Sequence, residues 1–582
     1  MMRRDSMVWS WTVAVSLLLM QSAALGAQKK ISGEQGSEQK PPTIPQLVDI
    51  TSSTGIHFEH LASPDQRYIV ESMGGGVALL DYDGDGWLDI YFTNGPSVAM
   101  ALEGKKASSA LYRNNHDGSF TDVSSKAGVE SPCWAMGAAV GDYNNDGKPD
   151  LVVSCFGGVV LYRNNGDGTF TDVTKPSGLD KDTGWATGVT FGDNDGDGYV
   201  DLFVPHYVDF DLKDLPTFGS RKTCQYHDVP VQCGPRGLKG YPDTLFHNNG
   251  NGTFTEVAAQ AGVDDPKRFF GLGAVWSDFD NDGKPDLFVA NDGEPNYLYH
   301  NEGQSRFREI GYEAGIAVSD DGVEQANMGL ALGDYLHTGR MSVAITHFSD
   351  EYAVLYRNDG NLSFSDVSHT AGIARPTERF VGWGDAFIDL ENSGWQDLVL
   401  VNGHVYPQVD NAKVGTAYRE PKLVFQNQRN GNFIDVSSQM GSVITTPQVS
   451  RGLAVGDLFN RGRLDLVIEN LTGSPLILET RPDPSHHWVG IQLEGVASNR
   501  MALNARVFVT TSTTQQMDEV RSGGSYLSQS DTRLHFGLGE ADKIEKLEIR
   551  WPDGISQVFQ NIAADRFFYL KEGGKLIERS QH

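Results

Sequence analysis

Short apolar runs alternate with acidic turns over most of the chain. Gly-Val-Ala-Leu-Leu comes directly before Asp81, and Leu-Asp-Ile-Tyr-Phe follows the turn that Asp81 opens. Short runs rich in aliphatic and β-branched residues on both sides of a turn predict a β-hairpin. The same pattern returns with its first acidic residue at Asp142, Asp193 and Asp278. Self-similarity of this kind indicates a repeat architecture built from strands.

A second pattern follows most of these hairpins and predicts two more strands in each unit. It reads Leu-Tyr-Arg-Asn-Asn, a glycine-containing turn, then Phe-Thr-Asp-Val and Ala-Gly-Val. Asn/Asp-Gly turns between apolar runs are typical of hairpins. Four strands in each unit are the content of one propeller blade. The copies lie at 111–129, 161–179, 245–263, 298–316 and 355–373, with a degenerate copy at 424–441.

Three weaker turns, beginning at Asp334, Asp389 and Asp457, raise the number of loops from four to seven. All seven keep Asp at position 1 and Gly at position 6. The seventh unit lacks its Phe-x-Asp-Val strand, whereas a matching strand, Leu47-Val48-Asp49-Ile50, stands before the first unit. One blade built from both ends closes a ring and removes exposed sheet edges. We therefore predict an all-β fold, with a seven-bladed β-propeller over 45–480 closed by its N-terminal strand.

The four strong loops place oxygen side chains at positions 1, 3, 5 and 9, with fifteen carboxylates and one amide, Asn144. Calcium takes roughly six to eight oxygen ligands on a backbone that turns sharply. The loops are not EF-hands, because position 12 is apolar (Phe92 in the first loop) and the flanks are β-rich. We expect about four structural Ca²⁺ ions and assign position 7 to the sites as well. The predicted metal residues are Asp81, Asp83, Asp85, Trp87, Asp89, Asp142, Asn144, Asp146, Lys148, Asp150, Asp193, Asp195, Asp197, Tyr199, Asp201, Asp278, Asp280, Asp282, Lys284 and Asp286.

The last three loops have lost ligand residues but keep the turn, because Gly at position 6 tolerates the positive φ that the turn demands. In the seventh loop, the guanidinium of Arg461 is expected to replace the cation electrostatically. The sixth loop retains Asp389, Glu391 and Asp397. Whether it binds a metal ion weakly is left open.

The acidic hairpin followed by Phe-Thr-Asp-Val resembles the FG-GAP (VCBS) repeat of integrin α-subunit propellers. A set of motifs near the C-terminus resembles the ASPIC/UnbV domain. Together the two are similar to the cartilage acidic protein-like family of bacteria. This resemblance implies an extracellular, calcium-supported fold and carries no agreed activity. The C-terminal motifs are Ser498-Asn499-Arg500, Ala505-Arg506-Val507, Gly523 to Gln529, Leu534 to Gly539 and Arg550 to Gly554.

Alternating apolar residues predict a small β-sandwich-like domain over 485–575, for example in Lys546-Leu-Glu-Ile-Arg-Trp. Such a domain stabilises the ring, serves in oligomerisation, or acts as a second binding module for carbohydrate. The sequence leaves these alternatives open.

The N-terminus predicts export. Arg3-Arg4, an apolar run over 8–19 and a small-residue segment ending at Ala27 form a secretory signal peptide over 1–27. A polar segment over 28–44 is predicted to be a disordered linker. The apolar run is too short for a membrane span, so no membrane insertion is expected. The net charge of −29 argues against nucleic acid and anionic membranes as partners. The expected location is secreted, periplasmic or at the cell surface.

Two of the four cysteines, Cys224 and Cys233, lie in one insertion, 206–243, and are predicted to form a disulfide in an exported protein. Pairing of Cys133 with Cys155 is left open.

The insertion is expected on the propeller face opposite the calcium loops, where chain segments leave the second strand of each blade. Polar residues recur at these exits and define a possible ligand face. One interpretation is a ring of binding groups around the channel mouth, including a transition-metal site of three histidines. The other is that the exits need polar side chains to satisfy turn backbones. The residues are His206, Asn291, His347, Asn402 and His404, with Asn94 and Asn470 at equivalent exits.

Aromatic residues near the same face, such as Trp134 and Trp185, are expected to pack between blades more often than to bind a ligand. No nucleophile elbow, zinc-protease, phosphate-loop or dinucleotide motif is present in the sequence. We therefore expect no enzyme, but a calcium-supported scaffold that binds an extracellular protein or carbohydrate. The alternative is a secreted hydrolase or lyase with its site at the channel mouth.

Overall fold

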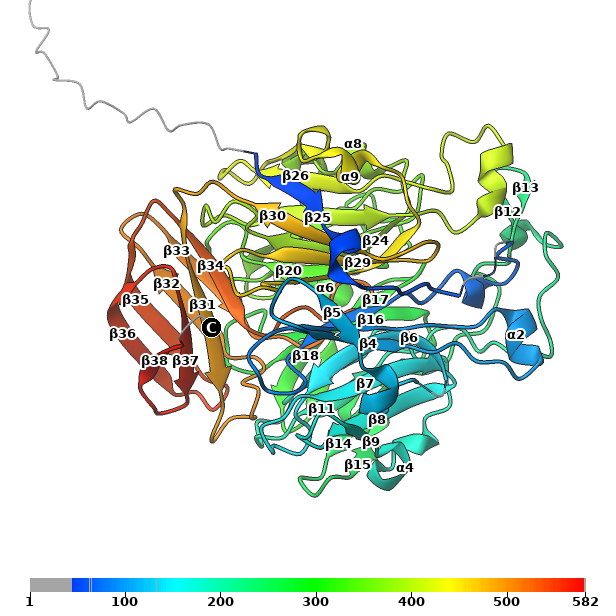
Figure 1. Cartoon of the computed structure of the whole chain (residues 1–582). Helices are drawn as coiled ribbons and strands as arrows, with labels where there is room; N and C mark the ends of the chain where they lie inside the picture. The colour runs from blue at the N-terminus through cyan, green and yellow to red at the C-terminus, as the bar shows by residue number, and fades with distance from the viewer. Residues whose placement is uncertain (1–43, 62, 64, 132, 580–582) are drawn as a thin grey trace, which may run out of the picture. The chain divides into compact units, whose positions relative to one another are not determined.

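The computed structural model describes residues 44–61, 63, 65–131 and 133–579. The predicted signal peptide, and the predicted linker up to residue 43, lie outside them. The described chain is dominated by four-stranded sheets, seven in the repeat region and two in the C-terminal region. The seven repeat sheets are antiparallel, whereas one of the C-terminal sheets contains a parallel strand pair. Figure 1 shows how these strands are arranged. The predicted all-β fold is confirmed.

Each of the seven repeat sheets is one blade. In the order from the channel outward, the strands are β2 (Val77–Leu80), β3 (Asp89–Phe92), β4 (Ala110–Asn114) and β5 (Phe120–Asp122); β6 (Trp134–Gly141), β7 (Asp150–Phe156), β8 (Gly158–Asn164) and β9 (Phe170–Asp172); β10 (Thr190–Gly192), β11 (Asp201–Val204), β14 (Thr244–Asn248) and β15 (Phe254–Glu256); β16 (Gly271–Ser277), β17 (Asp286–Asn291), β18 (Tyr297–Gly303) and β19 (Arg306–Glu309); β20 (Leu330–Gly333), β21 (Ser342–Ile345), β22 (Val354–Gly360) and β23 (Ser363–Asp366); β24 (Gly382–Ile388), β25 (Asp397–Asn402), β26 (Leu423–Asn427) and β27 (Phe433–Asp435); and β28 (Ser450–Gly456), β29 (Asp465–Asn470), β30 (Leu476–Arg481) and β1 (Gln46–Asp49).

The seven blades form a closed ring. The innermost strand of each blade contacts that of the next, in the order β2, β6, β10, β16, β20, β24, β28 and back to β2. The N-terminal strand β1 pairs antiparallel with β30, with Leu47 opposite Thr480, and becomes the outer strand of the seventh blade. The closure predicted from the two ends of the repeat array is therefore confirmed.

A glycine stands five residues before the first Asp of every loop, a regularity that the sequence analysis did not use. These glycines let neighbouring innermost strands approach backbone to backbone. A Cβ added to Gly329 would lie 1.9 Å from the carbonyl oxygen of Trp383 in the next blade. At six of the seven positions an added Cβ would lie less than 3.0 Å from another atom, whereas at Gly273 the nearest atom would be 3.6 Å away. The set is Gly76, Gly137, Gly188, Gly273, Gly329, Gly384 and Gly452.

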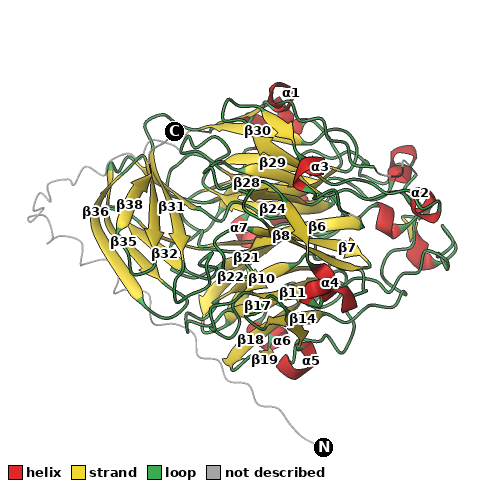
Figure 2. Cartoon of the chain, turned by 60° about the horizontal axis from the view of Figure 1, so that its bottom comes forward, coloured by secondary structure: helices red, strands yellow, loops and turns green. Residues whose placement is uncertain are grey.

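Short helices follow the Phe-x-Asp-Val strands and explain the Ala-Gly-Val signature (Figure 2). In the first blade, Asp122 accepts a hydrogen bond from Ser124 N at the start of α3. Gly128 ends this helix in the left-handed region, at φ 77°, the conformation that a helix C-terminus commonly requires. The helices are α1 (Thr51–Thr54), α2 (Val98–Leu102), α3 (Ser124–Ala127), α4 (Thr174–Ser177), α5 (Ala258–Ala261), α6 (Gly311–Ala314), α7 (Ser368–Ala371), α8 (Ala374–Thr377) and α9 (Ser442–Thr445), with 3₁₀ turns η1 (Ile69–Glu71), η2 (Leu179–Lys181), η3 (Lys222–Cys224), η4 (Pro407–Asn411) and η5 (Ser437–Gln439).

The C-terminal region forms two facing sheets, in the strand orders β34-β31-β37-β38 and β33-β32-β35-β36. Val489, Ile491 and Leu547 are among the fully buried residues of its core. The predicted β-sandwich-like architecture is confirmed. The strands are β31 (His487–Glu494), β32 (Arg506–Thr510), β33 (Gln515–Glu519), β34 (Leu534–Gly539), β35 (Lys543–Arg550), β36 (Ser556–Ala563), β37 (Arg566–Lys571) and β38 (Leu576–Arg579).

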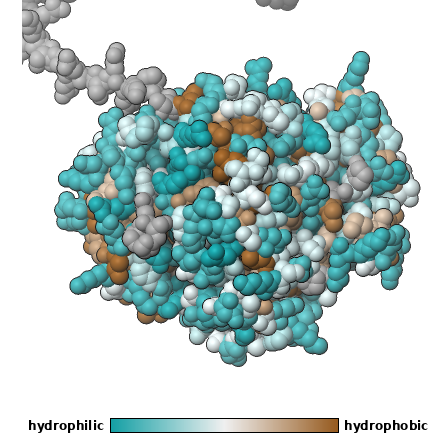
Figure 3. Space-filling view, in the orientation of Figure 1, coloured by the Kyte–Doolittle hydropathy of each residue, from teal (hydrophilic) through white to brown (hydrophobic). Residues whose placement is uncertain are grey.

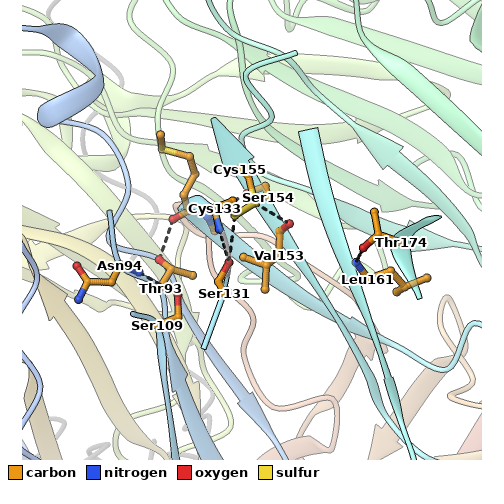
Figure 4. The surroundings of a disulfide bond; sticks show 12 residues. Thr93, Asn94, Ser109, Ser131, Cys133, Val153, Ser154, Cys155, Leu161 and Thr174 are labelled. Atoms are coloured by element: carbon orange, nitrogen blue, oxygen red, sulfur yellow. Dashed lines mark hydrogen bonds between the residues drawn. A yellow bond between two sulfur atoms is a disulfide. The ribbon is translucent and has the colours of Figure 1, made fainter. Parts of the chain in front are cut away.

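Two disulfides are formed. Cys224–Cys233 joins the two sides of the hairpin β12 (Gln225–Tyr226) and β13 (Val229–Pro230) in the insertion, as predicted. Cys133–Cys155, which the sequence left open, links the segment before β6 to β7. Figure 4 shows this pair with Ser131, whose Oγ lies 3.0 Å from Cys133 Sγ.

The surface seen in Figure 3 is mainly hydrophilic, with small, separate hydrophobic patches. Within the described ranges, no helix has the length and apolar character needed to cross a membrane.

We predict that Gly329→Ala destabilises the ring by about 1–3 kcal/mol, the usual cost of forcing extra atoms into a packed interior. The equivalent change Gly273→Ala is the matched control, because the nearest atom to its added Cβ is 3.6 Å away. Urea unfolding at saturating calcium measures both. Equal stability of the two variants would contradict the proposed role of the close backbone approach.

Candidate calcium loops and the filled channel

The first Asp of each loop holds the turn by hydrogen bonds to the backbone. In the first loop, Asp81 accepts from Asp85 N at 3.0 Å and from Gly86 N at 2.9 Å. The degenerate fifth loop keeps both bonds, from Thr338 N and Gly339 N to Asp334. Asp at position 1 and Gly at position 6 therefore persist where the other ligand residues are lost, because they build the turn itself.

The strong loops bring their carboxylates together. The carboxylate oxygens of positions 1, 3 and 5 lie within 4.8 Å of one another in the first loop (Asp81, Asp83, Asp85) and in the fourth. In the third loop, the corresponding group consists of Asp195, Asp197 and His247. Asp83 Oδ1 is buried and has no hydrogen-bond partner among the described residues. Oxygen ligands at this spacing fit a hard cation such as Ca²⁺.

The electrostatics of the loops also fit a cation. Burial, together with the charges of Asp142 and Asp146, raises the pKa of Asp150, at position 9, to about 8. Burial likewise raises the pKa of Asp193 to about 7, with the charge of Asp201 as the next cause. A divalent cation at the centre of each loop would reverse this penalty and favour the ionised carboxylates.

Three basic residues near the loops were missed by the sequence analysis. They occupy one repeat position, just before the Asn of the third strand. Arg113 Nε lies 2.6 Å from Asp83 Oδ2. His247 and His300 lie 3.1 Å and 2.9 Å from the position-9 carboxylates of the third and fourth loops. Calcium entering the first loop therefore competes with an ion pair. The sequence feature that could have identified them is the Arg or His that directly precedes the Asn in each non-degenerate copy of the Leu-Tyr-Arg-Asn motif.

Two degenerate loops compensate for lost ligands in different ways. In the seventh loop, Arg461 forms an ion pair with Asp465 at position 9, with a nitrogen–oxygen distance of 3.2 Å. This contact is the cation replacement expected from the sequence. In the sixth loop, Glu391 accepts a hydrogen bond from the amide of Gln426.

Residues at position 4 of the loops connect the ring to the C-terminal domain. Asn145 Oδ1 accepts from Arg500 N at 3.0 Å, and its Nδ2 donates to Gly198 O of the next loop. Asn460 Oδ1 accepts from Arg533 in the same way, while its Nδ2 donates to Gly86 O. Each asparagine thus ties a loop both to its neighbour and to the C-terminal domain. The domain therefore sits on the calcium-loop face.

A loop of the C-terminal domain, residues 519–531, fills the channel of the propeller. Its backbone forms strand-like hydrogen bonds with β2, from Leu79 N to Gln529 O and from Gln529 N to Val77 O, both 2.9 Å. It pairs with β20 through Leu330 and Ser525. Each of the seven innermost strands donates or accepts at least one hydrogen bond with this segment. We call it the channel plug.

The tip of the channel plug reaches the opposite mouth. Tyr526 is fully buried and meets Trp383 edge-on, with ring centroids 4.6 Å apart. Arg451 lies over the same Trp383 ring at 4.0 Å and donates to Ser72 O and Gly403 O. Tyr207, from the insertion, belongs to the same hydrophobic cluster. The channel is therefore closed from both sides, which the sequence analysis did not foresee.

The predicted ligand-face residues are buried and make local hydrogen bonds. His206 Nε2 lies 2.9 Å from Asp182, and His347 Nε2 lies 2.9 Å from Asn327. His404 Nδ1 accepts from Tyr406 N. Burial lowers the pKa of both His347 and His404 to about 3. Among the described residues, these histidines are not part of any group with metal-ligand spacing.

The asparagines of that face satisfy turn backbones. Asn291 Nδ2 donates to Pro295 O at 2.8 Å, and Asn402 Nδ2 donates to Pro421 O at 2.7 Å. Trp134 and Trp185 are buried within the central hydrophobic cluster. These contacts favour the structural interpretation of the exit residues and of the aromatic residues.

The insertion face carries an open hollow of about 410 Å³. Tyr226, from the disulfide-linked hairpin β12–β13, forms one wall, and its hydroxyl lies 2.8 Å from Ser349 Oγ. Figure 1 shows the hairpin β12–β13 on the side of the propeller away from strands β31–β38. The lining residues are Tyr226, Ser349, Asp350, Glu378, Arg379, Val414, Gly415 and Thr416.

Comparison with known proteins identifies both modules. The family "FG-GAP-like repeat" matches residues 81–153, 142–204 and 278–345, and the family "ASPIC and UnbV" matches residues 495–577. The chain therefore carries FG-GAP-like repeats and an ASPIC/UnbV domain.

The chain is homologous to cartilage acidic protein 1. It is 22% identical to the Mus musculus protein over 524 residues, covering 84% of this chain and 63% of the relative. It is 23% identical to the Homo sapiens protein over 335 residues, covering 56% and 39%. The chain thus spans less than two thirds of the length of these relatives.

Among solved structures, an Agrocybe aegerita lectin that recognises terminal N-acetylglucosamine aligns with a TM-score of 0.38 and 17% identity, covering 69% of this chain and 87% of the lectin. BBS1N, from its complex with ARL6DN, aligns with a TM-score of 0.40 and 12% identity, covering 76% and 99%.

One buried residue departs from the repeat. Asp385 lies four residues before the sixth loop, where the other six blades carry apolar residues. Both of its carboxylate oxygens are buried and have no hydrogen-bond partner in the described part of the chain. It lines a cavity of about 140 Å³ beside the channel plug. The equivalent residues are Val77, Ala138, Val189, Ala274, Leu330 and Leu453.

We predict that Asp385→Val stabilises the protein at pH 7 by about 1–3 kcal/mol, because it removes a buried, unsatisfied polar group. Burial raises the pKa of Asp385 well above its ordinary value. Folding therefore favours the protonated carboxyl. The stability that this group contributes is fully present below about pH 3.9, its pKa in the unfolded chain, and is lost as the pH rises through its folded-state pKa. The gain from Asp385→Val should shrink as the pH falls from 7 to 4. Melting temperatures across this range test it, and a gain that grows toward pH 4 would contradict it.

Proposed function

We propose that the chain is an exported recognition scaffold whose insertion face binds an extracellular protein or glycan. The open hollow beside the disulfide-stapled hairpin carries this proposal. Binding sites are commonly built on loops that a rigid scaffold holds in place. Here the scaffold is a closed ring with a filled channel, and the loops are the insertion and the segments that contact it. The homology to cartilage acidic protein 1 and the two disulfides support an extracellular or periplasmic setting.

We propose a binding role rather than a catalytic one. The predicted ligand-face residues, which would have to form a hydrolase or lyase site at the channel mouth, are buried and make local hydrogen bonds, as described for His206 and His347. A hydrolytic or lyase site needs a group that reaches the substrate with a suitable pKa. The low pKa of His347, about 3, leaves this imidazole neutral and a weak base at neutral pH.

Calcium is proposed to act structurally. Each ion would neutralise a loop and hold the position-4 asparagines against the C-terminal domain. Binding only to the folded state stabilises that state, by about 2.7 kcal/mol for each site at 100 times its Kd. The calcium loops and the insertion face would then have separate roles, one in stability and one in recognition.

The first test of this role is thermal unfolding of the mature chain in EDTA, followed by titration with calcium or magnesium. We expect a large rise in melting temperature with calcium and about four bound ions, because the four strong loops have the ligand sets described above. Asp282→Asn should lower the stoichiometry by about one ion, whereas the exposed control Asp180→Asn should leave it unchanged. An absence of any calcium response would reject the structural role.

The insertion face is tested with charge reversal at Arg379, an exposed residue of the hollow. Calcium-loaded protein is applied to an array of glycans and to purified extracellular proteins. Arg379→Glu should reduce the wild-type signal at least tenfold, because charge at the site governs complementarity. The control Arg550→Glu, in the C-terminal domain, should keep it. Equal binding by wild type and Arg379→Glu would reject this face as the recognition surface.

A further inference from the structure

A second hollow lies on the calcium side, between the first two loops and the C-terminal domain. It consists of two adjoining spaces of about 290 and 440 Å³, which share Gly84, Gly86, Gln492, Arg533 and Arg579 in their walls. Ligand pockets of about 300–1,000 Å³ are the usual size for small molecules. We call this space the loop-1 cleft. It is distinct from the insertion face, and nothing in it depends on the recognition role proposed above.

The loop-1 cleft exists because the first loop lacks a side chain at position 4. Four other loops carry Asn at this position, and all four asparagines form a hydrogen bond with the C-terminal domain, as described for Asn145 and Asn460. A Cβ added to Gly84 would meet no atom within 4 Å. The third loop also has Gly, Gly196, which is not part of the cleft.

The walls of the cleft carry charges of both signs. The basic residues are Lys148, Arg500, Arg533 and Arg579, and the acidic residues are Asp81, Asp85, Asp142, Glu494, Asp531 and Glu578. Arg579 lies over the ring of Tyr569 at 5.1 Å and makes no ion pair with any residue of the described ranges. The acidic wall residues of the C-terminal domain are paired, for example Glu494 with Lys571 at 2.9 Å and Asp531 with Arg533 at 2.8 Å. Asp81, Asp85 and Asp142 belong to the first two loops, where the proposed calcium ions would balance their charge. A free guanidinium beside paired carboxylates favours an anionic group on a ligand.

Two buried polar atoms in the walls have unused hydrogen-bonding capacity. Arg500 Nε, a donor, and Gln492 Oε1, an acceptor, meet no partner among the described residues. Both residues line the cleft. A buried donor and acceptor left unsatisfied cost free energy. Both atoms are closed off from solvent in this structure, so a ligand would pair with them, and recover that free energy, once the two side chains turn toward the cleft. A hydroxyl group does so, because it can donate to Gln492 and accept from Arg500.

Aromatic residues complete the cleft. Trp87, at position 7 of the first loop, lines it and stacks on His116 with ring centroids 4.7 Å apart. Phe567 lines it as well. Aromatic surfaces provide apolar contact area with defined geometry. The cleft thus offers planar apolar contact, a pair of groups that can bind a hydroxyl, and the free guanidinium of Arg579. This combination suits a sugar acid better than it suits a neutral sugar or an apolar ligand.

We propose that the loop-1 cleft binds an acidic oligosaccharide, with Arg579 contacting the carboxylate and with Arg500 and Gln492 contacting hydroxyl groups. Such a ligand would bridge the first calcium loop and the C-terminal domain. The C-terminal domain would then supply most of the polar contacts of a saccharide site that is completed only when this domain docks on the ring.

The test measures binding of tetramers of galacturonate, mannuronate and glucuronate by calorimetry at fixed free calcium, with maltotetraose as the neutral probe. We expect at least one acidic tetramer to bind, and the neutral tetramer to bind at least tenfold more weakly. Binding of none of the acidic tetramers, or equal binding of the neutral one, would overturn the proposal.

Gly84→Asn provides the sharpest variant. It introduces the residue that four other loops carry at this position, and the positive φ of Gly84, 75°, is one that Asn accepts, as Asn281 does at 66°. The variant should fold and bind calcium normally, yet fill the cleft and weaken saccharide binding at least tenfold. Gly196→Asn, at φ 72° in the third loop, is the matched control and should bind as wild type.

Arg579→Gln should weaken binding of the acidic tetramer without changing the melting temperature or the calcium stoichiometry. If Gly84→Asn binds as tightly as wild type, or if Gly196→Asn weakens binding as much, the site is not the loop-1 cleft. Because these measurements use neither the insertion face nor Arg379, their failure and that of the recognition proposal are distinguishable.

Discussion

The close approach of seven backbones to one loop organises this protein. Each innermost strand offers hydrogen-bonding groups toward the channel, and buried groups of this kind must be paired. In this chain the pairing comes from the channel plug, for example from Gln529 to Val77 and Leu79. Glycines such as Gly76 allow the contact, because a Cβ there would lie 2.2 Å from Leu527 O. Ring, plug and C-terminal domain are therefore one packed unit, although the sequence presents them as two modules.

The acidic loops combine two kinds of stabilisation that separate along the repeat. Position 1 and position 6 form a hydrogen-bonded turn that needs no ion, as Asp334 and Gly339 show in the degenerate fifth loop. The remaining carboxylates add charge that only a cation can balance, and in the seventh loop Arg461 takes that place for Asp465. The same hairpin thus tolerates loss of the metal site without loss of the turn.

Local patterns made much of the fold predictable. Periodic hairpins and the missing strand of the seventh unit identified the ring and its closure, because each is encoded within a few residues. The short helices after the Phe-x-Asp-Val strands were not predicted. The channel plug was not predictable in this way. Its partners, such as Ser525 with Leu330, are far apart in sequence, and the motif Gly523 to Gln529 shows no complementary pattern in the blades. The repeated glycine was visible, but its reason is a contact between blades. Likewise, His247 was visible as a repeat variant, and only the fold places it beside Asp195 and Asp197.

The channel plug also bears on how such a chain can evolve. Tandem repeats usually change in number by duplication or deletion of a unit. In a ring with an empty channel, each blade would accept an additional blade beside it. Here residues 519–531 span a channel whose width is set by seven blades, and they bond to every one of the innermost strands. A ring of six or eight blades would leave this loop either too wide or too narrow for its channel. The C-terminal domain therefore constrains the number of blades to seven, whereas individual loops remain free to gain or lose their metal ligands.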